Sequence, residues 1–185
     1  MNETMKSLLT RRSIRSFETR QVPDDLLQQI VEAGRYAATG MGRQPWHFTV
    51  VQNRALLDWI VAENVKAILA SGNERTIERA KDPNYDNFYH APTVIVVSGT
   101  GEGSIVIADC ANAMQNMAVA AHSLGLGSCY LASFSMAFRD GRMPELAQRL
   151  GVPEGFTPMF ALAVGYAAGP APEPAPRKDN VNYIR

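Results

Sequence analysis

The chain has 185 residues, of which 46% are hydrophobic and 19% charged, and its 18 basic side chains balance its 18 acidic ones. This length suits a single domain, which we place at residues 1–185, and the composition excludes a disordered chain. The charge balance speaks against binding to nucleic acid or to a membrane surface, because both would require an excess of Lys and Arg.

Neither membrane insertion nor secretion is indicated. No apolar run has the length of a spanning helix, and residues 1–12 do not have the pattern of a secretion signal. Cys110 and Cys129 form no Cys-x-x-Cys pair, so we expect two buried free thiols in a reducing compartment. These features predict a cytoplasmic protein.

The first half of the chain is predicted to contain a helix over 4–10, a helix over 23–38, a strand over 46–52 and a helix over 54–69. Pro23 suits the first turn of its helix, and Gly40 and Gly42 end the helical pattern. Residues 71–90 are the least patterned part of the chain, and we expect a mobile loop or lid there.

The second half is predicted to contain a strand over 93–98, a helix over 107–124, a strand over 128–131, a helix over 144–150 and a strand over 156–166. The helix over 107–124 is apolar nearly all round and rich in small residues, so we expect a central helix that another helix approaches closely. Residues 167–185 are proline-rich and predict an extended arm that ends in a possible strand at 181–184. Few strands and long helices favour an α+β fold.

Four segments contain residues suited to binding a cofactor. Arg11, Arg12, Ser13 and Arg15 could clamp a phosphate, since guanidinium groups make forked hydrogen bonds to its oxygens. A solvated basic patch is the alternative interpretation. The other three segments are a glycine loop at 39–46, the small-residue segment 125–134, and Arg177 with Lys178 after the prolines. For these, an ordinary turn, a glycine that ends a helix and a solvated tail are the alternatives.

Other motifs carry little weight. Residues 99–104 imitate a dinucleotide-binding loop, but Ser104 replaces the third glycine. His47, His90 and His122 are scattered and no carboxylate lies at ligand spacing, so no metal site is expected. Ser128 does not lie in the Gly-x-Ser-x-Gly elbow of a hydrolase.

Four motifs in order, RRSIRSF, TGMGRQPWHFTVV, AAHSLGLGSCYLASF and PRK, resemble the nitroreductase (NADH oxidase-like) flavoprotein family over nearly the whole chain. The resemblance implies a nitroreductase-like α+β sandwich with a small mixed sheet flanked by helices. It also implies a domain-swapped homodimer that exchanges its C-terminal arms and holds FMN at the interface.

The resemblance assigns roles to thirteen residues. Those matching the FMN phosphate and ribityl segment are Arg11, Arg12, Ser13 and Arg15. Those matching a loop lent to the flavin of the other subunit are Thr39, Gly40 and Gln44. Those matching the segment beside the flavin ring and its N5 are Tyr130, Leu131, Ala132 and Ser133. Arg177, and less strongly Lys178, match a C-terminal basic residue that returns to the phosphate.

The chain also departs from the family pattern. Gly42 stands where relatives often have Asn, which removes a side-chain donor from the loop. Ala132-Ser133 stands where some relatives have Glu-Gly, so no role of that carboxylate carries over.

The implied activity is reduction of an electron-poor acceptor, of nitroaromatic or quinone type, by NADH or NADPH in two half-reactions through flavin N5. No catalytic side chain is expected, and Arg15 is the candidate for tuning the flavin. Alternatives from the same family are a dehalogenase or an enoate-type reductase. Alternatives from other classes are a flavin storage or sensing protein and an interaction module without cofactor.

Overall fold

The computed structural model describes residues 1–101 and 103–185 and has an α+β fold around one four-stranded sheet. In sequence order the strands are β1 (Trp46–Val51), β2 (Thr93–Thr100), β3 (Gly127–Leu131) and β4 (Phe156–Gly165). The helices are α1 (Glu3–Thr10), α2 (Asp24–Arg35), α3 (Arg54–Ala70), α4 (Glu74–Ala80), α5 (Ser104–Ser123) and α6 (Met143–Arg149). Two 3-10 turns complete the described elements, η1 (Gly40–Gly42) and η2 (Met136–Phe138).

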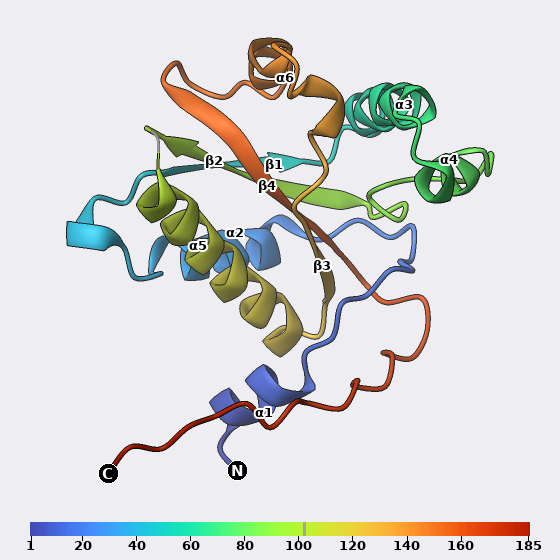
Figure 1. Cartoon of the computed structure of the whole chain (residues 1–185). Coiled ribbons are helices and arrows are strands. Elements are labelled where there is room, and N and C mark those ends of the chain that lie inside the picture. Colours follow the sequence, from blue (N-terminus) through green and yellow to red (C-terminus); the bar gives the residue numbers. More distant parts are fainter. Residues whose placement is uncertain (102) are drawn as a thin grey trace.

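The strands lie in the order β1-β2-β4-β3, and every neighbouring pair is antiparallel. Helices cover both faces of the sheet, with α2 and α5 on one side and α3 and α6 on the other (Figure 1). The α+β sandwich expected from the sequence is therefore confirmed.

Alternation along β2 explains why its whole length is apolar. Val94 and Val96 point into the core under α3 and α6, whereas Ile95 and Val97 point into the core under α2 and α5. Successive strand residues face opposite sides of a sheet, so a strand covered on both faces needs apolar residues at every position.

The central helix expected from the sequence is α5. It begins at Ser104, three residues before the predicted start, and buries Cys110, Met114 and Met117. The helix that approaches it closely is α2, where a Cβ placed on Gly34 would lie 2.8 Å from Met117 Cγ. The small residues of the sequence thus permit close packing of two helices on one face of the sheet.

The N-terminal segment after α1 pairs with two strand ends. Ser13 forms an isolated parallel bridge with Ser128 of β3, where the Ile14 N–H donates to the Ser128 carbonyl at 2.9 Å. Phe17 forms an antiparallel bridge with Ala167, just beyond β4. Within the described residues the bridge at Ser13 is the only parallel pairing, so the mixed character predicted for the sheet is limited to this bridge.

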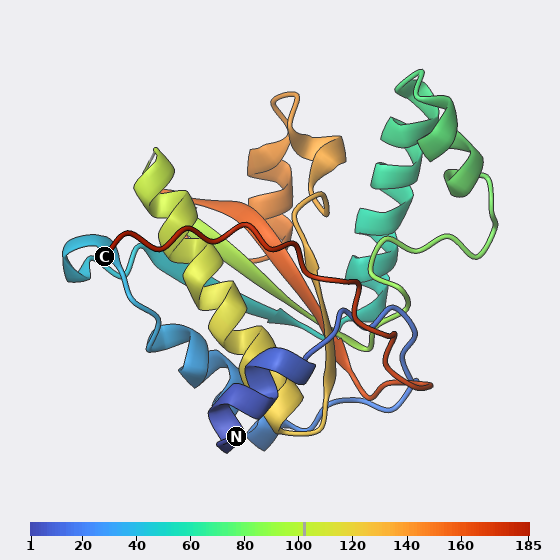
Figure 2. The same ribbon diagram turned by 60° about the horizontal axis from the view of Figure 1, so that its bottom comes forward.

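Two predictions need correction. Residues 71–90 are not simply a loop, because they contain α4, whose first turn is capped by the Asn73 side chain accepting from the Thr76 N–H at 3.3 Å. The helix is too short for its apolar spacing to stand out in the sequence. Residues 181–184 form no strand in this single chain, and the arm from residue 168 onward runs exposed outside the layers of the domain (Figure 2).

The close contact between Gly127 and Ile14 leads to a prediction about stability. A Cβ on Gly127 would lie 2.8 Å from Ile14 Cγ1, so Gly127→Ala must push the N-terminal segment away from β3. We expect a loss of about 1–3 kcal/mol in the free energy of unfolding, measured by urea denaturation. Gly169→Ala is the control, because its Cβ meets no described atom within 4 Å, and a change within about 0.5 kcal/mol is expected. Equal stability of the two variants would contradict the packing at Ile14.

Candidate functional site

The basic segment 11–15 lies between α1 and the outer edge of β3. Arg11 and Arg12 are half-buried and Arg15 is exposed. Among the described residues, no carboxylate lies within ion-pair distance of any of the three arginines. Their positive charges are therefore not neutralised inside the chain and remain available to an anion.

The three arginines do not point into one hollow. Arg11 and Arg12 line a pocket of about 200 Å³ together with His122 and the start of β3. The Arg12 guanidinium also donates to the Leu9 and Arg11 carbonyls, at 2.8 Å each. Arg15 lines a different pocket of about 520 Å³, where its guanidinium carbon lies 5.9 Å from the centre of the Tyr89 ring.

The exit of β3 is the second part of the site. Tyr130 is 39% exposed, and its ring centre lies 5.3 Å from that of Phe160. Leu131 is buried, whereas Ala132 and Ser133 are exposed beyond the end of the strand. Because Ser13 pairs in parallel with Ser128, the N-terminal segment and β3 run alongside each other in the same direction. The structure thus brings the segment with Arg15 beside the segment with Tyr130.

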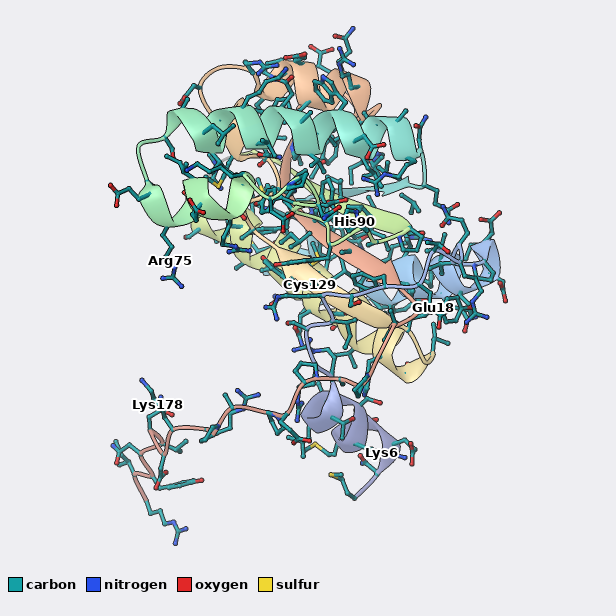
Figure 3. The ribbon with its side chains drawn as sticks, turned by 90° about the vertical axis from the view of Figure 1, so that its right-hand side faces the viewer. Lys6, Glu18, Arg75, His90, Cys129 and Lys178 are labelled. Carbon is teal, nitrogen blue, oxygen red and sulfur yellow. The ribbon has the colours of Figure 1, made fainter. Side chains whose placement is uncertain are left out.

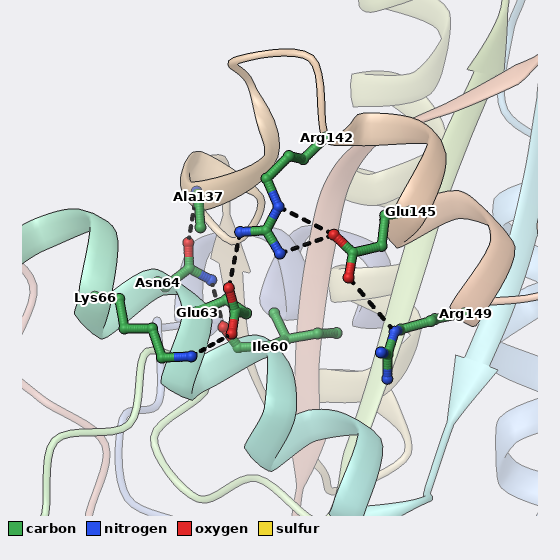
Figure 4. A network of polar contacts seen from close by, with 8 residues as sticks. All are labelled: Ile60, Glu63, Asn64, Lys66, Ala137, Arg142, Glu145 and Arg149. Carbon is green, nitrogen blue, oxygen red and sulfur yellow. Dashed lines mark hydrogen bonds and ion pairs between the residues drawn. The ribbon is translucent and has the colours of Figure 1, made fainter.

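A buried amide holds the turn that follows this exit. Asn64 of α3, only 2% exposed, donates to the Phe134 carbonyl at 2.6 Å. It also accepts from the Ala137 N–H at 3.1 Å (Figure 4). The same amide donates to the Ile60 carbonyl at 3.0 Å, so its hydrogen bonds are satisfied on both sides. The turn therefore has a fixed position relative to α3.

Ion pairs reinforce this contact from outside. Glu63 of α3 accepts from Arg142 at 2.8 Å and from Lys66 at 2.7 Å, and Arg142 also bonds Glu145 at 2.7 Å (Figure 4). The two cations lower the pKa of Glu63 below its usual range by hydrogen bonding to the carboxylate. These exposed pairs add less stability than the buried amide does. Neither Asn64 nor Glu63 lies in a recognisable motif, so the sequence alone gives no signal for either residue.

The loop with Thr39, Gly40 and Gln44 lies elsewhere. The Gly40 N–H donates to the buried Asp109 carboxylate at 3.0 Å, which fixes the loop near the start of α5. The basic segment lies near the other end of that helix, beside His122. From Asp109 to His122 the helix rises about 20 Å, at about 1.5 Å per residue. Within one chain, these two parts of the predicted site are not brought together.

Arg177 and Lys178 also stay apart from the basic segment. Both are exposed on the arm, and Figure 3 shows Lys178 projecting well away from the body of the domain. Only the start of the arm approaches the site, where Ala167 and Ala171 line the pocket of Arg11 and Arg12.

The pocket of Arg15 contains aromatic residues that are not among the site residues predicted from the sequence. Its wall includes Phe17, Tyr85 and Tyr89 as well as charged groups. Tyr89 and His90 both lie in the left-handed region of backbone conformation, with φ angles of 57° and 56°. Residues other than glycine rarely adopt this conformation. Such conformations concentrate at functional sites, where the surrounding structure holds them. Here Asp86 accepts from the Phe88 N–H at 2.6 Å and pairs with Arg54 of α3 at 3.0 Å.

Asn87, in the same loop, has a second unusual feature. Its amide nitrogen and oxygen are both buried and have no hydrogen-bond partner among the described residues. An unsatisfied buried amide is costly, so a bound group with its own donors and acceptors would stabilise it.

The remaining sequence motifs take structural roles or none. The segment that resembles a dinucleotide-binding loop, residues 99–104, includes the end of β2 and the start of α5, and its Glu102 lies outside the described residues. The strands before and after α5, β2 and β3, are not neighbours in the sheet, so the described residues form no parallel dinucleotide-binding unit. Among residues 1–101 and 103–185, no group of three His, Cys, Asp or Glu side chains is placed to hold a metal ion. Across those same residues, the helices are all too short or too polar to span a membrane.

The two cysteines are free and buried, as expected. Burial raises the pKa of the Cys110 thiol to about 11 and also raises the pKa of Cys129. Both thiols are therefore protonated at neutral pH, which makes them poor nucleophiles.

Comparison with known proteins gives consistent results. A family model described as the Nitroreductase family matches residues 8–166. A solved nitroreductase with bound FMN from Desulfitobacterium hafniense DCB-2 is 34% identical, with a TM-score of 0.93 and full coverage of both chains. One from Bacteroides fragilis, also with bound FMN, is 33% identical with a TM-score of 0.89 and full coverage of both. An FMN reductase [NAD(P)H] of Bacillus subtilis is 26% identical over 99% of this chain and 74% of its own length.

The buried hydrogen bonds of Asn64 lead to a prediction about stability. Asn64→Ala would leave the Phe134 carbonyl and the Ala137 N–H buried without their partner, so we expect about 2–4 kcal/mol less stability in urea denaturation. Glu63→Gln is the matched control on the same helix, since it weakens only ion pairs to the exposed cations Arg142 and Lys66 and should cost less than about 1 kcal/mol. If the control cost as much as the Asn64 variant, the ion pairs and not the amide would hold the turn.

Proposed function

The chain belongs to the nitroreductase family, and on this premise we propose that it is an FMN-dependent oxidoreductase that uses NADH or NADPH to reduce electron-poor acceptors. One observation carries the proposal. The parallel bridge between Ser13 and Ser128 places the segment of Arg11, Arg12 and Arg15 beside the end of β3. Among the described residues, these three arginines have no carboxylate partner. Two family members of known structure, 33% and 34% identical to this chain, have FMN bound.

The described residues fit a flavin mononucleotide in two respects. Arg11, Arg12 and Arg15 provide the positive charge that a phosphate and a reduced, anionic ring would both require. The buried amide of Asn87 provides an unused donor and an unused acceptor, and a flavin ring presents both kinds of group along one edge. Tyr130, Ala132 and Ser133 offer exposed surface beside these charges.

When bound, FMN would supply the hydride-transfer chemistry between the nicotinamide donor and the acceptor. The side chains provide binding and electrostatics. Arg11, Arg12 and Ser13 would bind the phosphate and the sugar-alcohol chain, and Arg15 would stabilise negative charge on the ring. No side chain needs to act as acid or base, because solvent can supply the proton to many acceptors.

The pocket of Arg15 supports a proposal for the class of acceptor. Phe17, Tyr85 and Tyr89 line a space of about 520 Å³ beside the guanidinium group. Aromatic walls suit a flat ring, and a cation suits one that gains negative charge during reduction. We therefore propose nitroaromatic or quinone-type acceptors.

The active unit in this proposal is a homodimer with arm exchange. The loop of Thr39, Gly40 and Gln44 lies about 20 Å along α5 from the basic segment, so it would serve the flavin of a second copy. Large hydrophobic side chains remain exposed on elements that a partner would cover. They are Met5, Leu8 and Leu9 on α1, Ile105 and Ile107 on α5, and Val181, Tyr183 and Ile184 on the arm. A partner would also give Arg177 and Lys178 a phosphate to bind. The two free thiols fit the predicted cytoplasmic location.

The proposal predicts a yellow protein. We expect the visible absorption spectrum of the purified protein to show near-stoichiometric FMN, and anaerobic NADH or NADPH to bleach it rapidly. The donor that bleaches it faster is the preferred one. Retained flavin that is not reduced would instead indicate a storage or sensing protein, and a colourless protein that cannot bind added FMN would refute the proposal.

Substitution of Arg15 tests its electrostatic role. We expect Arg15→Ala to slow flavin reduction by about tenfold or more, since a charged contact contributes about 1.5–3 kcal/mol. Arg15→Lys keeps the charge and should recover most of the rate, measured by anaerobic stopped-flow absorbance. If Arg15→Ala left both the FMN affinity and the reduction rate unchanged, Arg15 would have no role at the flavin.

A further inference from the structure

Three nitrogen-bearing side chains converge on one small pocket at the junction of α1, the end of α5 and the start of β3. Arg11, Arg12 and His122 line its volume of about 200 Å³, together with the backbone around Gly127 and Ser128. Figure 2 shows α1 beside this end of α5, with the N-terminal segment passing on to the sheet. His122 is the member of this group that has no role in the function proposed above.

We propose that this pocket takes a phosphate monoester, that of bound FMN, and that His122 binds it in its protonated form. Flavin affinity then depends on pH near neutrality. The inference rests on the proposed function, because it assigns one further residue and a pH response to the same cofactor.

The hydrogen bonds decide which ring nitrogen carries the changing proton. The Thr10 hydroxyl donates to the Lys6 carbonyl at 2.7 Å. Its only proton is thereby used, so at 2.8 Å the hydroxyl oxygen must accept from His122 Nε2. Nε2 therefore keeps its proton in both charge states, and Nδ1 is the nitrogen that gains or loses one.

The electrostatics of the pocket set the direction of the response. Burial, with the charges of Arg11 and Arg12, lowers the pKa of His122 below its usual range. Arg11 and Arg12 are the charged groups that line the pocket together with His122. The other neighbours are uncharged: Ala167 and Ala171 from the arm, and the Thr10 hydroxyl from α1. Without an anion, His122 is thus neutral at neutral pH.

A phosphate dianion would reverse this balance. It would offset both guanidinium charges and attract a third cation, so the pKa of His122 is higher in the complex than in the free protein. The complex then binds one more proton than its separated parts do. The gain in affinity is fully present below the pKa of the free protein and is lost as the pH rises through the pKa of the complex.

The test measures dissociation constants of FMN and of riboflavin, which lacks the phosphate, from quenching of flavin fluorescence between pH 6.5 and 8.5. This range stays above the second ionisation of the phosphate itself, near pH 6. The full chain, released from its flavin, is compared with His122→Gln, which keeps a donor toward Thr10 but not the charge. His122→Lys carries a charge at every pH tested. His47→Gln, on β1 and outside this pocket, is the matched histidine control.

We expect FMN to bind about threefold to fivefold more tightly to the unaltered chain at pH 6.5 than at pH 8.5. A pKa about one higher in the complex would give about tenfold in full, but only below the pKa of the free protein. His122→Gln should lose this pH dependence and His122→Lys should bind tightly throughout, while His47→Gln should follow the unaltered chain. Riboflavin binding should not respond to any of the His122 changes.

Two results would overturn the inference. One is the same pH dependence for FMN in His122→Gln as in the unaltered chain. The other is unchanged FMN binding in that variant combined with a raised KM for NADPH but not for NADH, which would assign the pocket to the phosphate of the nicotinamide donor. Failure of the unaltered chain to bind either flavin would instead refute the proposed function, so the two failures are distinguishable.

Discussion

The hydrogen bond from the Ile14 N–H to the Ser128 carbonyl, 2.9 Å long, joins the N-terminal segment to the edge of the sheet. It holds the basic residues on either side of Ile14 along β3, and the Ile14 side chain packs against the bare backbone of Gly127. An isolated backbone pairing of this kind is weak, and the packing of a buried side chain makes it stable. Without it, the arginines would form part of a tail and would have no fixed relation to Tyr130.

The length of α5 imposes a second constraint. Asp109 binds the glycine loop near one end of the helix, and His122 faces the basic segment near the other. A rigid helix cannot bring its own ends together, so one chain contains two halves of the proposed site that it cannot combine. A second copy is the simplest way to complete it, and the uncovered hydrophobic side chains on α1, α5 and the arm are consistent with such a partner.

The opposite face of the sheet contributes rigidity. The Asn64 amide and the Glu63–Arg142 pair tie the turn after β3 to α3, while Arg54 of the same helix holds Asp86 in the loop of Tyr89. One helix thus fixes both the turn that follows β3 and the loop that carries Tyr89. Site residues held by buried hydrogen bonds keep their geometry better than residues on free loops do.

The sequence by itself determined the order of the main helices and strands, the α+β class and the family, because apolar periodicity and short motifs are local properties. Arg11 to Arg15 and Tyr130 to Ser133 were also identifiable as residue types suited to a flavin. Only the tertiary structure decided that these segments lie side by side and that Thr39 and Gln44 lie far from them. It also decided that Asn64 holds the turn after β3, that the amide of Asn87 is buried without a partner among the described residues, and that His122 lines the pocket of Arg11 and Arg12. Those relations depend on contacts between residues distant in the sequence, and α4 was missed because a helix of two turns has too short a pattern to recognise.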